Sequence, residues 1–170
     1  WMSRDQRVRD NWALLEAQQQ ALAMRQPLVV VFCLADLFLG ACLRQYDFML
    51  RGLEQVRDDL SRRNIRFVLL RGDPVSRLTE YLRSIKAGCL YTDFDPLKIK
   101  RSWKQAVSRT IKVSFREVDA HNIVPCWQAS SKQEFGAYTL RPKLWSQVPE
   151  YWQTIPAVQK HPYALSGRLV

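Results

Sequence analysis

The sequence predicts an α/β fold in which a parallel sheet lies between two layers of helices. Two observations predict it: helical and strand-like segments alternate along residues 1–124, and the strand-like segments are short, continuous runs of apolar residues. Such runs are typical of strands that are buried on both faces of a parallel sheet. The 170 residues suffice for one domain with a substantial core and are too few for two comfortable ones.

The segments follow one another in a regular order. The predicted helices span residues 5–25, 43–63, 74–85 and 96–109, and the predicted strands span residues 28–33, 65–70, 88–92 and 113–118. The first helix has apolar side chains at three- and four-residue spacing, with Ser3 or Asp5 as its N-cap and Pro27 after its end. Pro74 suits the first turn of the third helix. The last strand alternates in polarity, so we place it near an edge of the sheet.

A fifth strand should come before the first helix. Strand, crossover helix and parallel strand form the repeating unit of such folds, yet only Trp1–Ser3 precede the first helix. We therefore expect a Rossmann-like, three-layer domain with a five-stranded parallel sheet. Its first strand is expected to be largely absent from this sequence, and the native chain to be longer.

Residues 125–170 differ in composition from residues 1–124. They contain five of the eight prolines and show no convincing periodicity. We predict that residues 1–124 form the α/β domain. Residues 125–170 are predicted to be a wrapping segment that ends in the start of an interdomain linker.

Positive charge is concentrated in the second half of the chain. The net charge is +10, and residues 98–170 carry 12 basic and 4 acidic side chains. Residues 98–116 hold seven cations and no acid, which suggests a polyanionic neighbour such as nucleic acid; the alternative is a solvated helix face.

No apolar run is long enough to span a membrane, and four scattered cysteines favour a reducing, intracellular compartment.

No standard catalytic fingerprint occurs, and we predict no catalytic residue. The sequence lacks the Gly-x-Gly-x-x-Gly loop of dinucleotide sites, the Walker phosphate loop and the Gly-x-Ser-x-Gly elbow. It also lacks a Cys-x-x-Cys pair, so we predict no metal site. Helix capping before Pro96 explains Asp93 and Asp95 at least as well as a cation does.

Two segments resemble signatures of the photolyase and cryptochrome family. Residues 4–7 read Arg-Asp-Gln-Arg and residues 10–14 read Asp-Asn-Trp-Ala-Leu, which resembles the Arg-Asp-x-Arg…Asp-Asn-x-Ala-Leu signature that follows the first strand of these proteins. Residues 118–127 (VDAHNIVPCW) resemble the corresponding segment of class II cyclobutane pyrimidine dimer photolyases. Further similarity to class II members follows in order at residues 1–7, 48–50, 92–94, 129–130, 132–134 and 138–143. Because this similarity spans nearly the whole chain, the chain resembles the N-terminal α/β domain of that family.

The resemblance implies a light-dependent DNA repair function for a parent protein. In this family a larger, C-terminal helical domain holds FAD and the flipped thymine dimer of UV-damaged DNA, and light-excited reduced flavin donates an electron to the dimer. Residues 161–163 resemble the linker toward that helical domain. The flavin-binding and lesion-binding helices are therefore expected to be absent here, and this chain alone to be inactive.

The α/β domain of the family can hold a second, light-harvesting chromophore, a deazaflavin or a folate. Ligands of open parallel sheets bind beyond the carboxyl ends of the strands. From these strand ends we take as candidate chromophore contacts Ser3, Arg4, Asp5, Cys33, Asp36, Phe38, Asp93 and Phe94. The alternative for each is helix capping or domain packing.

Four cations of the basic helix are candidates for steering the protein toward DNA. They are Lys98, Lys100, Arg101 and Lys104.

The expected partners are the FAD domain of the same protein and, through the parent enzyme, UV-damaged DNA; we expect a monomer in the cytoplasm or, in a eukaryote, the nucleus. Two alternatives are a free-standing, non-catalytic module of this fold and an unrelated nucleotide-binding α/β protein.

Overall fold

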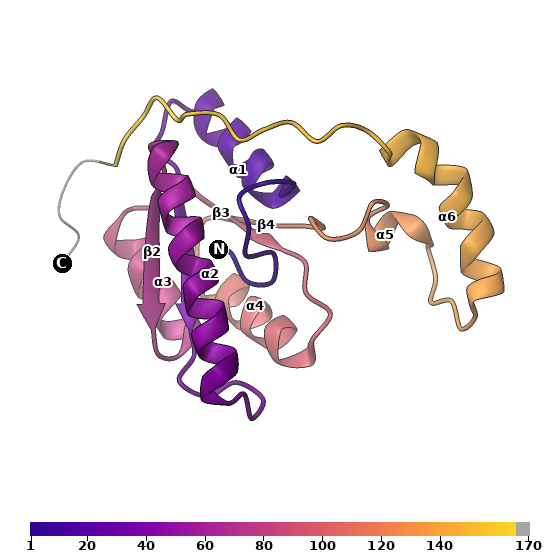
Figure 1. The fold of residues 1–170 in the computed structure, drawn as a ribbon, viewed down its shortest axis with the longest axis horizontal. Helices are drawn as coiled ribbons and strands as arrows, with labels where there is room; N and C mark the ends of the chain where they lie inside the picture. The colour runs from indigo at the N-terminus through magenta and orange to yellow at the C-terminus, as the bar shows by residue number, and fades with distance from the viewer. Residues whose placement is uncertain (166–170) are drawn as a thin grey trace.

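The structure is a computed structural model that describes residues 1–165, and it confirms the α/β class (Figure 1). The elements in chain order are α1 (Trp12–Ala23), β1 (Val29–Leu34), α2 (Leu43–Arg62), β2 (Arg66–Arg71), α3 (Pro74–Ser84), β3 (Cys89–Asp93), α4 (Lys98–Thr110), β4 (Ser114–Val118), α5 (Cys126–Ala129) and α6 (Ala137–Tyr151). Each predicted strand is present within one residue of its expected bounds, since each is a short apolar run between turn residues.

The strands form two parallel pairs that the N-terminal residues connect. β1 pairs with β2, and β3 pairs with β4. Met2 forms a parallel bridge to Phe32 of β1, and its N–H donates to the carbonyl of Val31 at 2.9 Å. On the other side, the amino group of Trp1 donates to the carbonyl of Tyr91 in β3 at 2.7 Å. The spatial order is therefore β2, β1, the Trp1–Met2 segment, β3 and β4, so a single bridge stands where the fifth strand was expected.

Helices cover both faces of this sheet. Val31 and Cys33 of β1 lie in a core with Leu78 of α3 and Val107 of α4. Val30 faces the opposite way and packs with residues of α1 and α2. Alternate side chains of one strand thus enter two cores, as the continuous apolar run of β1 predicts. None of the helices within residues 1–165 is long and apolar enough to cross a membrane.

The prediction that the first helix begins at residue 5 is wrong. The helix begins at Trp12, and its N-cap is Asn11, whose side chain accepts the N–H of Leu14 at 3.1 Å. Residues 3–10 form a loop instead, and Asp10 ends it with a φ of 50°. The physical reason lies far away in sequence, because backbone N–H groups of this loop donate to the side chain of Asp93.

Residues 125–151, which we call the arm, are more regular than predicted. They form α5 and α6, although two prolines lie inside α6. Figure 1 shows α5 and α6 set apart from the α/β body (residues 1–124), joined to it by two extended connections. The second connection returns to the body, where the N–H of His161 donates to the carbonyl of Arg63 at 2.7 Å. Residues 166–170 of the predicted linker lie outside the described residues.

Candidate functional site

A pocket of about 340 Å³ opens at the carboxyl edge of the sheet. It is bounded by the end of β1, the loop after Trp1–Met2, the turn between β3 and α4, and the first turns of α2 and α4. Its lining residues are Ser3, Arg4, Gln6, Phe32, Cys33, Leu34, Ala35, Phe38, Ala41, Gln45, Tyr46, Met49, Asp95, Leu97, Lys100 and Trp103. This is the edge at which parallel α/β folds bind ligands.

Aromatic and aliphatic side chains form most of the pocket wall. The rings of Phe38 and Trp103 lie 6.0 Å apart at an angle of 49°. Tyr46 and Met49 contribute from α2, and the hydroxyl of Tyr46 donates to the carbonyl of Ala35 at 3.0 Å, which fixes the ring. The wall therefore offers apolar surface for a planar molecule.

Lys100 is one of three charged residues in this wall, together with Arg4 and Asp95. Its Nζ lies 5.0 Å from the centre of the Phe38 ring and 5.1 Å from that of Trp103, so it makes cation–π contacts with both. Burial lowers the pKa of Lys100, although Asp95 and Asp93 oppose the shift through space. Lys100 forms no ion pair with any residue of the range 1–165, so its charge is available to a ligand.

Asp93 holds the loop that carries Ser3 and Arg4. Its carboxylate accepts the backbone N–H groups of Ser3, Arg4 and Asp5 at 3.1, 2.8 and 2.7 Å. Asp93 is only 2% exposed, so these bonds satisfy a buried charge. Ser3 lines the pocket, and its hydroxyl is buried and has no hydrogen-bond partner among residues 1–165. A buried polar atom without a partner is costly, and a bound ligand is one way to satisfy it.

Cys33 lines the same pocket as an inert thiol. Burial raises the pKa of Cys33 to about 11, and the positive charges nearby are too weak to offset it. The side chain therefore stays protonated near neutral pH and acts as a small apolar group rather than a nucleophile.

The structure brings together four of the eight candidate contacts. Ser3, Arg4, Cys33 and Phe38 all line the pocket. Asp93 lies beneath the loop and positions it. The remaining three, Asp5, Asp36 and Phe94, do not line the pocket and contact other residues.

Those three candidates have identifiable partners outside the pocket. The carboxylate of Asp5 is 1% exposed and forms an ion pair with Arg7, and Nδ1 of His121 lies 3.3 Å from Oδ1 of Asp5. Asp36 is paired at 2.8 Å with Arg71 at the surface. The ring of Phe94 packs edge-on against Trp127, with centres 5.7 Å apart, which joins the body to the arm. Of these contacts, only that of Phe94 is packing between two parts of the chain.

Asp119 organises the turn that leads into the arm. Its carboxylate accepts the N–H groups of His121, Asn122 and Cys126 and the side-chain amide of Asn122. Burial alone would raise the pKa of Asp119, but the hydrogen bonds from Asn122, Cys126 and His121 outweigh it and lower the pKa. The motif at residues 118–127 thus has a local structural role.

The four cations proposed for DNA steering occupy different environments. Lys98 and Arg101 are exposed on α4. Lys100 faces the pocket, and Lys104 is only 4% exposed, with its ammonium paired to Glu117 at 2.6 Å. Of the four, only Lys98 and Arg101 are therefore exposed, because residues 100, 103, 104 and 107 form the inner face of α4 at three- and four-residue spacing.

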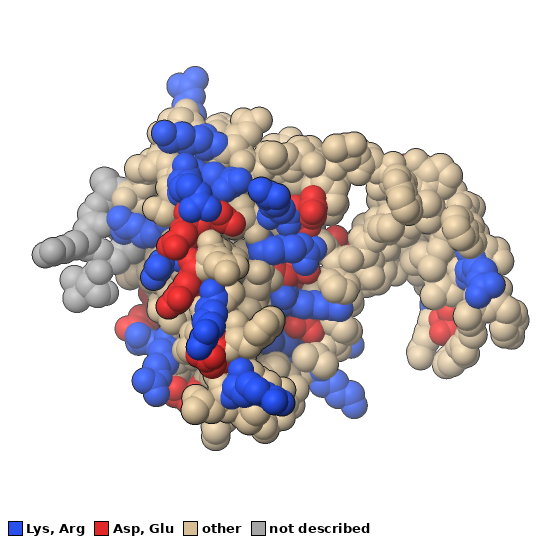
Figure 2. Space-filling model, in the orientation of Figure 1, with Lys and Arg blue, Asp and Glu red and all other residues tan. Residues whose placement is uncertain are grey.

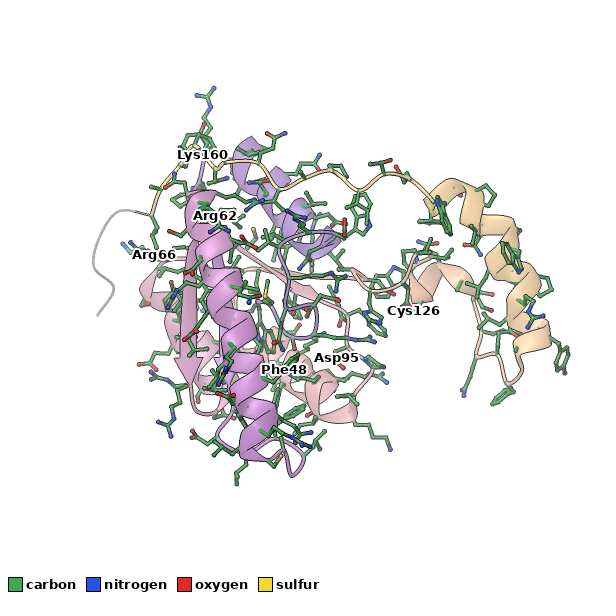
Figure 3. All side chains as sticks on the ribbon, in the orientation of Figure 1. Phe48, Arg62, Arg66, Asp95, Cys126 and Lys160 are labelled. Atoms are coloured by element: carbon green, nitrogen blue, oxygen red, sulfur yellow. The ribbon has the colours of Figure 1, made fainter. Side chains whose placement is uncertain are left out.

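Sequence reasoning missed the helical half of the pocket. Tyr46, Met49, Lys100 and Trp103 line it from α2 and α4, whereas the predicted contacts came from strand ends. The order of the elements could have predicted these residues. A helix that follows a parallel strand begins at the edge where the strand ends, so its first turns face any ligand there. Figure 3 shows this end of the molecule, with Asp95 labelled in the turn before α4.

The geometry defines a Rossmann-like α/β domain with a pocket at the carboxyl edge of its sheet. The sequence model of the DNA photolyase family matches residues 1–160. The chain therefore belongs to the DNA photolyase family, and it corresponds to the N-terminal α/β domain of that family.

Three relatives illustrate the similarity, each named deoxyribodipyrimidine photo-lyase. The chain is 50% identical over 165 residues to that of Potorous tridactylus, 44% over 161 residues to that of Arabidopsis thaliana, and 35% over 144 residues to that of Methanothermobacter thermautotrophicus. These alignments cover 96%, 94% and 85% of this chain but 31%, 32% and 32% of the relatives. The chain thus spans about a third of the length of the relatives that it matches.

Proposed function

We propose that the pocket at the carboxyl edge binds a light-harvesting chromophore. The pocket itself carries this proposal, since its volume of about 340 Å³ falls within the roughly 300–1,000 Å³ of ligand sites. It combines apolar walls with the Ser3 hydroxyl, which has no hydrogen-bond partner among residues 1–165, and the Lys100 ammonium, which lies over two aromatic rings. A planar, conjugated molecule with a polar edge fits this combination.

The lining residues have distinct roles in this proposal. Phe38 and Trp103 offer faces for a planar ring, Lys100 attracts an electron-rich or anionic edge, and Ser3 supplies a hydrogen bond. A deazaflavin and a folate both have these features, so both are candidates. When bound, such a pigment absorbs light and passes the excitation energy to FAD in another part of the parent protein.

A spectroscopic titration tests the pocket. The purified chain is mixed with a deazaflavin or with a folate, and the absorption spectrum is followed at increasing concentration. We expect saturable binding of one of them, weakened about tenfold in Phe38→Ala because a ring contact is lost. Phe48→Ala is the matched control, since Phe48 is exposed on α2 outside the pocket (Figure 3). Absence of saturable binding for both pigments would overturn the proposal.

We further propose that the parent protein is a class II DNA photolyase that acts inside the cell, as a monomer, in the cytoplasm or nucleus. Its FAD and its UV-damaged DNA would bind outside residues 1–170. The names of the relatives support photorepair, and the resemblance of residues 118–127 supports the class. The test is light-dependent repair of a dimer-containing oligonucleotide by the product of the full reading frame. A reading frame that stops near Val170 would instead favour a free-standing binding module.

A further inference from the structure

Lys100 and Trp103 lie side by side on the inner face of α4, and both line the pocket. They are three residues apart on the helix, and the ammonium of Lys100 lies 5.1 Å from the centre of the Trp103 ring. The ring of Phe38, from the loop after β1, lies 5.0 Å from the same ammonium. A cation at such a distance is attracted to the face of an aromatic ring. The two rings therefore hold the charge of Lys100 beside Trp103.

Trp103 is the lining side chain that gives up an electron most readily. It is the only indole among the pocket residues of the range 1–165. A neutral indole can lose an electron without first losing a proton. The phenol of Tyr46, by contrast, donates its proton to the carbonyl of Ala35, which is not a base. The thiol of Cys33 stays protonated, because burial raises its pKa to about 11.

Electron donation from Trp103 would compete with light harvesting. In that step the indole of Trp103 is oxidised by one electron and an excited pigment in the pocket is reduced by one electron. The electron then returns, so no bond changes and the excitation energy is lost as heat. A pocket that serves energy transfer to FAD has to keep this competing reaction slow.

The charge of Lys100 opposes the oxidation of Trp103. Loss of an electron would place a positive indole 5.1 Å from a positive ammonium, and like charges repel more strongly where water is scarce. Figure 2 shows many lysine and arginine side chains at the surface of the body, with acidic side chains among them, where water and salt screen their charges. Lys100, in contrast, is half-buried.

Two carboxylates near Lys100 favour its charged form. Burial lowers the pKa of Lys100, and Asp95 and Asp93 oppose that shift through space. Both carboxylates also accept backbone N–H groups, that of Asp95 from Leu97 at 3.0 Å and that of Asp93 from Arg4 at 2.8 Å. Their own charge is therefore partly compensated, and they offset the field of the ammonium at Trp103 only in part.

We propose that Lys100 protects the excited state of a pigment bound in the pocket, because its charge makes Trp103 harder to oxidise. Lys100 acts through Trp103 and takes no part in the electron transfer itself. The inference rests on the proposed binding of a light-harvesting chromophore, and it assigns to Lys100 a role that binding alone does not require.

Time-resolved fluorescence of the bound pigment tests this role. The pigment that binds in the absorption titration is measured at saturation in the wild type and in single variants. We expect its lifetime to fall about threefold in Lys100→Met, because a neutral chain of similar length leaves Trp103 easier to oxidise. Lys100→Arg should keep the wild-type lifetime, since it keeps the charge. Lys98→Met is the matched control, because Lys98 is exposed on α4 outside the pocket.

The double variant Lys100→Met, Trp103→Phe distinguishes oxidation of Trp103 from a general loosening of the pocket. We expect the full lifetime in the double variant, because the electron donor is absent. A short lifetime in the double variant, or an unchanged lifetime in Lys100→Met, would overturn the proposal. If the wild type binds neither pigment, the titration itself shows that the chromophore proposal fails, and the role of Lys100 fails with it.

A second measurement needs no pigment. Azide radicals are uncharged, and each is reduced to azide as it takes one electron from an indole; mass spectrometry then locates the oxidised product at Trp103. We expect this oxidation to be about tenfold faster in Lys100→Met than in the wild type or in Lys98→Met. Equal rates in all three would show that Lys100 does not control Trp103, whether or not a pigment binds.

Discussion

The α/β body and the arm are ordered by different forces. In the body, Leu60, Leu78 and Val107 are fully buried, and two cores sandwich the sheet. In the arm, α6 has no buried residue, and an ion pair between Lys143 and Glu134 fixes it to the preceding loop. The body is therefore stabilised mainly by burial, whereas the arm depends more on polar contacts.

The largest effect should come from the buried carboxylate at the centre of the body. We expect Asp93→Ala to lower the free energy of unfolding by about 4 kcal/mol, because three backbone N–H groups lose their acceptor in a buried place. Urea unfolding followed by circular dichroism measures it. Asp36→Ala, which breaks an exposed pair with Arg71, is the control and should leave the free energy of unfolding nearly unchanged. Equal losses in both variants would refute this account of Asp93.

A pair of leucine substitutions compares the two regions directly. Leu78→Ala in α3 should cost about 3 kcal/mol, since a fully buried side chain leaves a cavity. Leu144→Ala in α6 should cost about 1 kcal/mol or less, because its site is half-exposed. Thermal unfolding of both variants gives the comparison. A larger loss for Leu144 would show that the arm has a core of its own.

Acid should loosen the arm through Glu134. Its hydrogen bond from Lys143, with help from Thr139 and Ser130, lowers the pKa of Glu134 to about 2. Because the folded pKa lies below the unfolded one, this contribution is complete above about pH 4.5 and is lost as the pH falls toward 2. Tryptophan fluorescence of the arm, followed over this range, should change less in Glu134→Gln than in the wild type. Identical titrations would show that the pair does not hold α6.

The smallest effect concerns long-range attraction to DNA. The double variant Lys98→Gln, Arg101→Gln should reduce the salt dependence of DNA binding by the full-length protein, by a log–log slope of about 1 or less. Lys100→Gln is the matched control on the same helix, since Lys100 faces the pocket. An unchanged slope of binding against salt in the double variant would show that α4 does not attract DNA at long range.

The sequence predicted what depends on local pattern. The strands were placed within one residue because their apolar runs are continuous, and Ser3, Arg4, Cys33 and Phe38 were found because ligands gather at strand ends. The early start assigned to α1 was wrong because residues 3–10 are held by Asp93, about 90 residues away. The periodicity of the residues around a helix cannot predict a contact with a residue so distant in the sequence.

The sequence pattern did not predict helix α6 or the inward orientation of two lysines of α4, for different reasons. Helix α6 was missed because Pro142 and Pro149 suppress the helical signal, although neighbouring residues still form the helix. Lys100 and Lys104 were grouped with Lys98 and Arg101 because all four lie in one basic run. Their inward placement depends on the rotation of α4 against the sheet, which the sequence leaves open.

Asp93 has a thermodynamic consequence beyond its hydrogen bonds. The same side chain ends β3 and anchors the loop of Ser3 and Arg4, so the pocket wall and the middle of the sheet form or melt together. Any molecule that binds only the folded pocket then shifts the folding equilibrium, by about 2.7 kcal/mol at a concentration a hundred times its Kd. A pigment held there would stabilise the folded state, and its occupancy would determine the resistance of the domain to heat and to proteases.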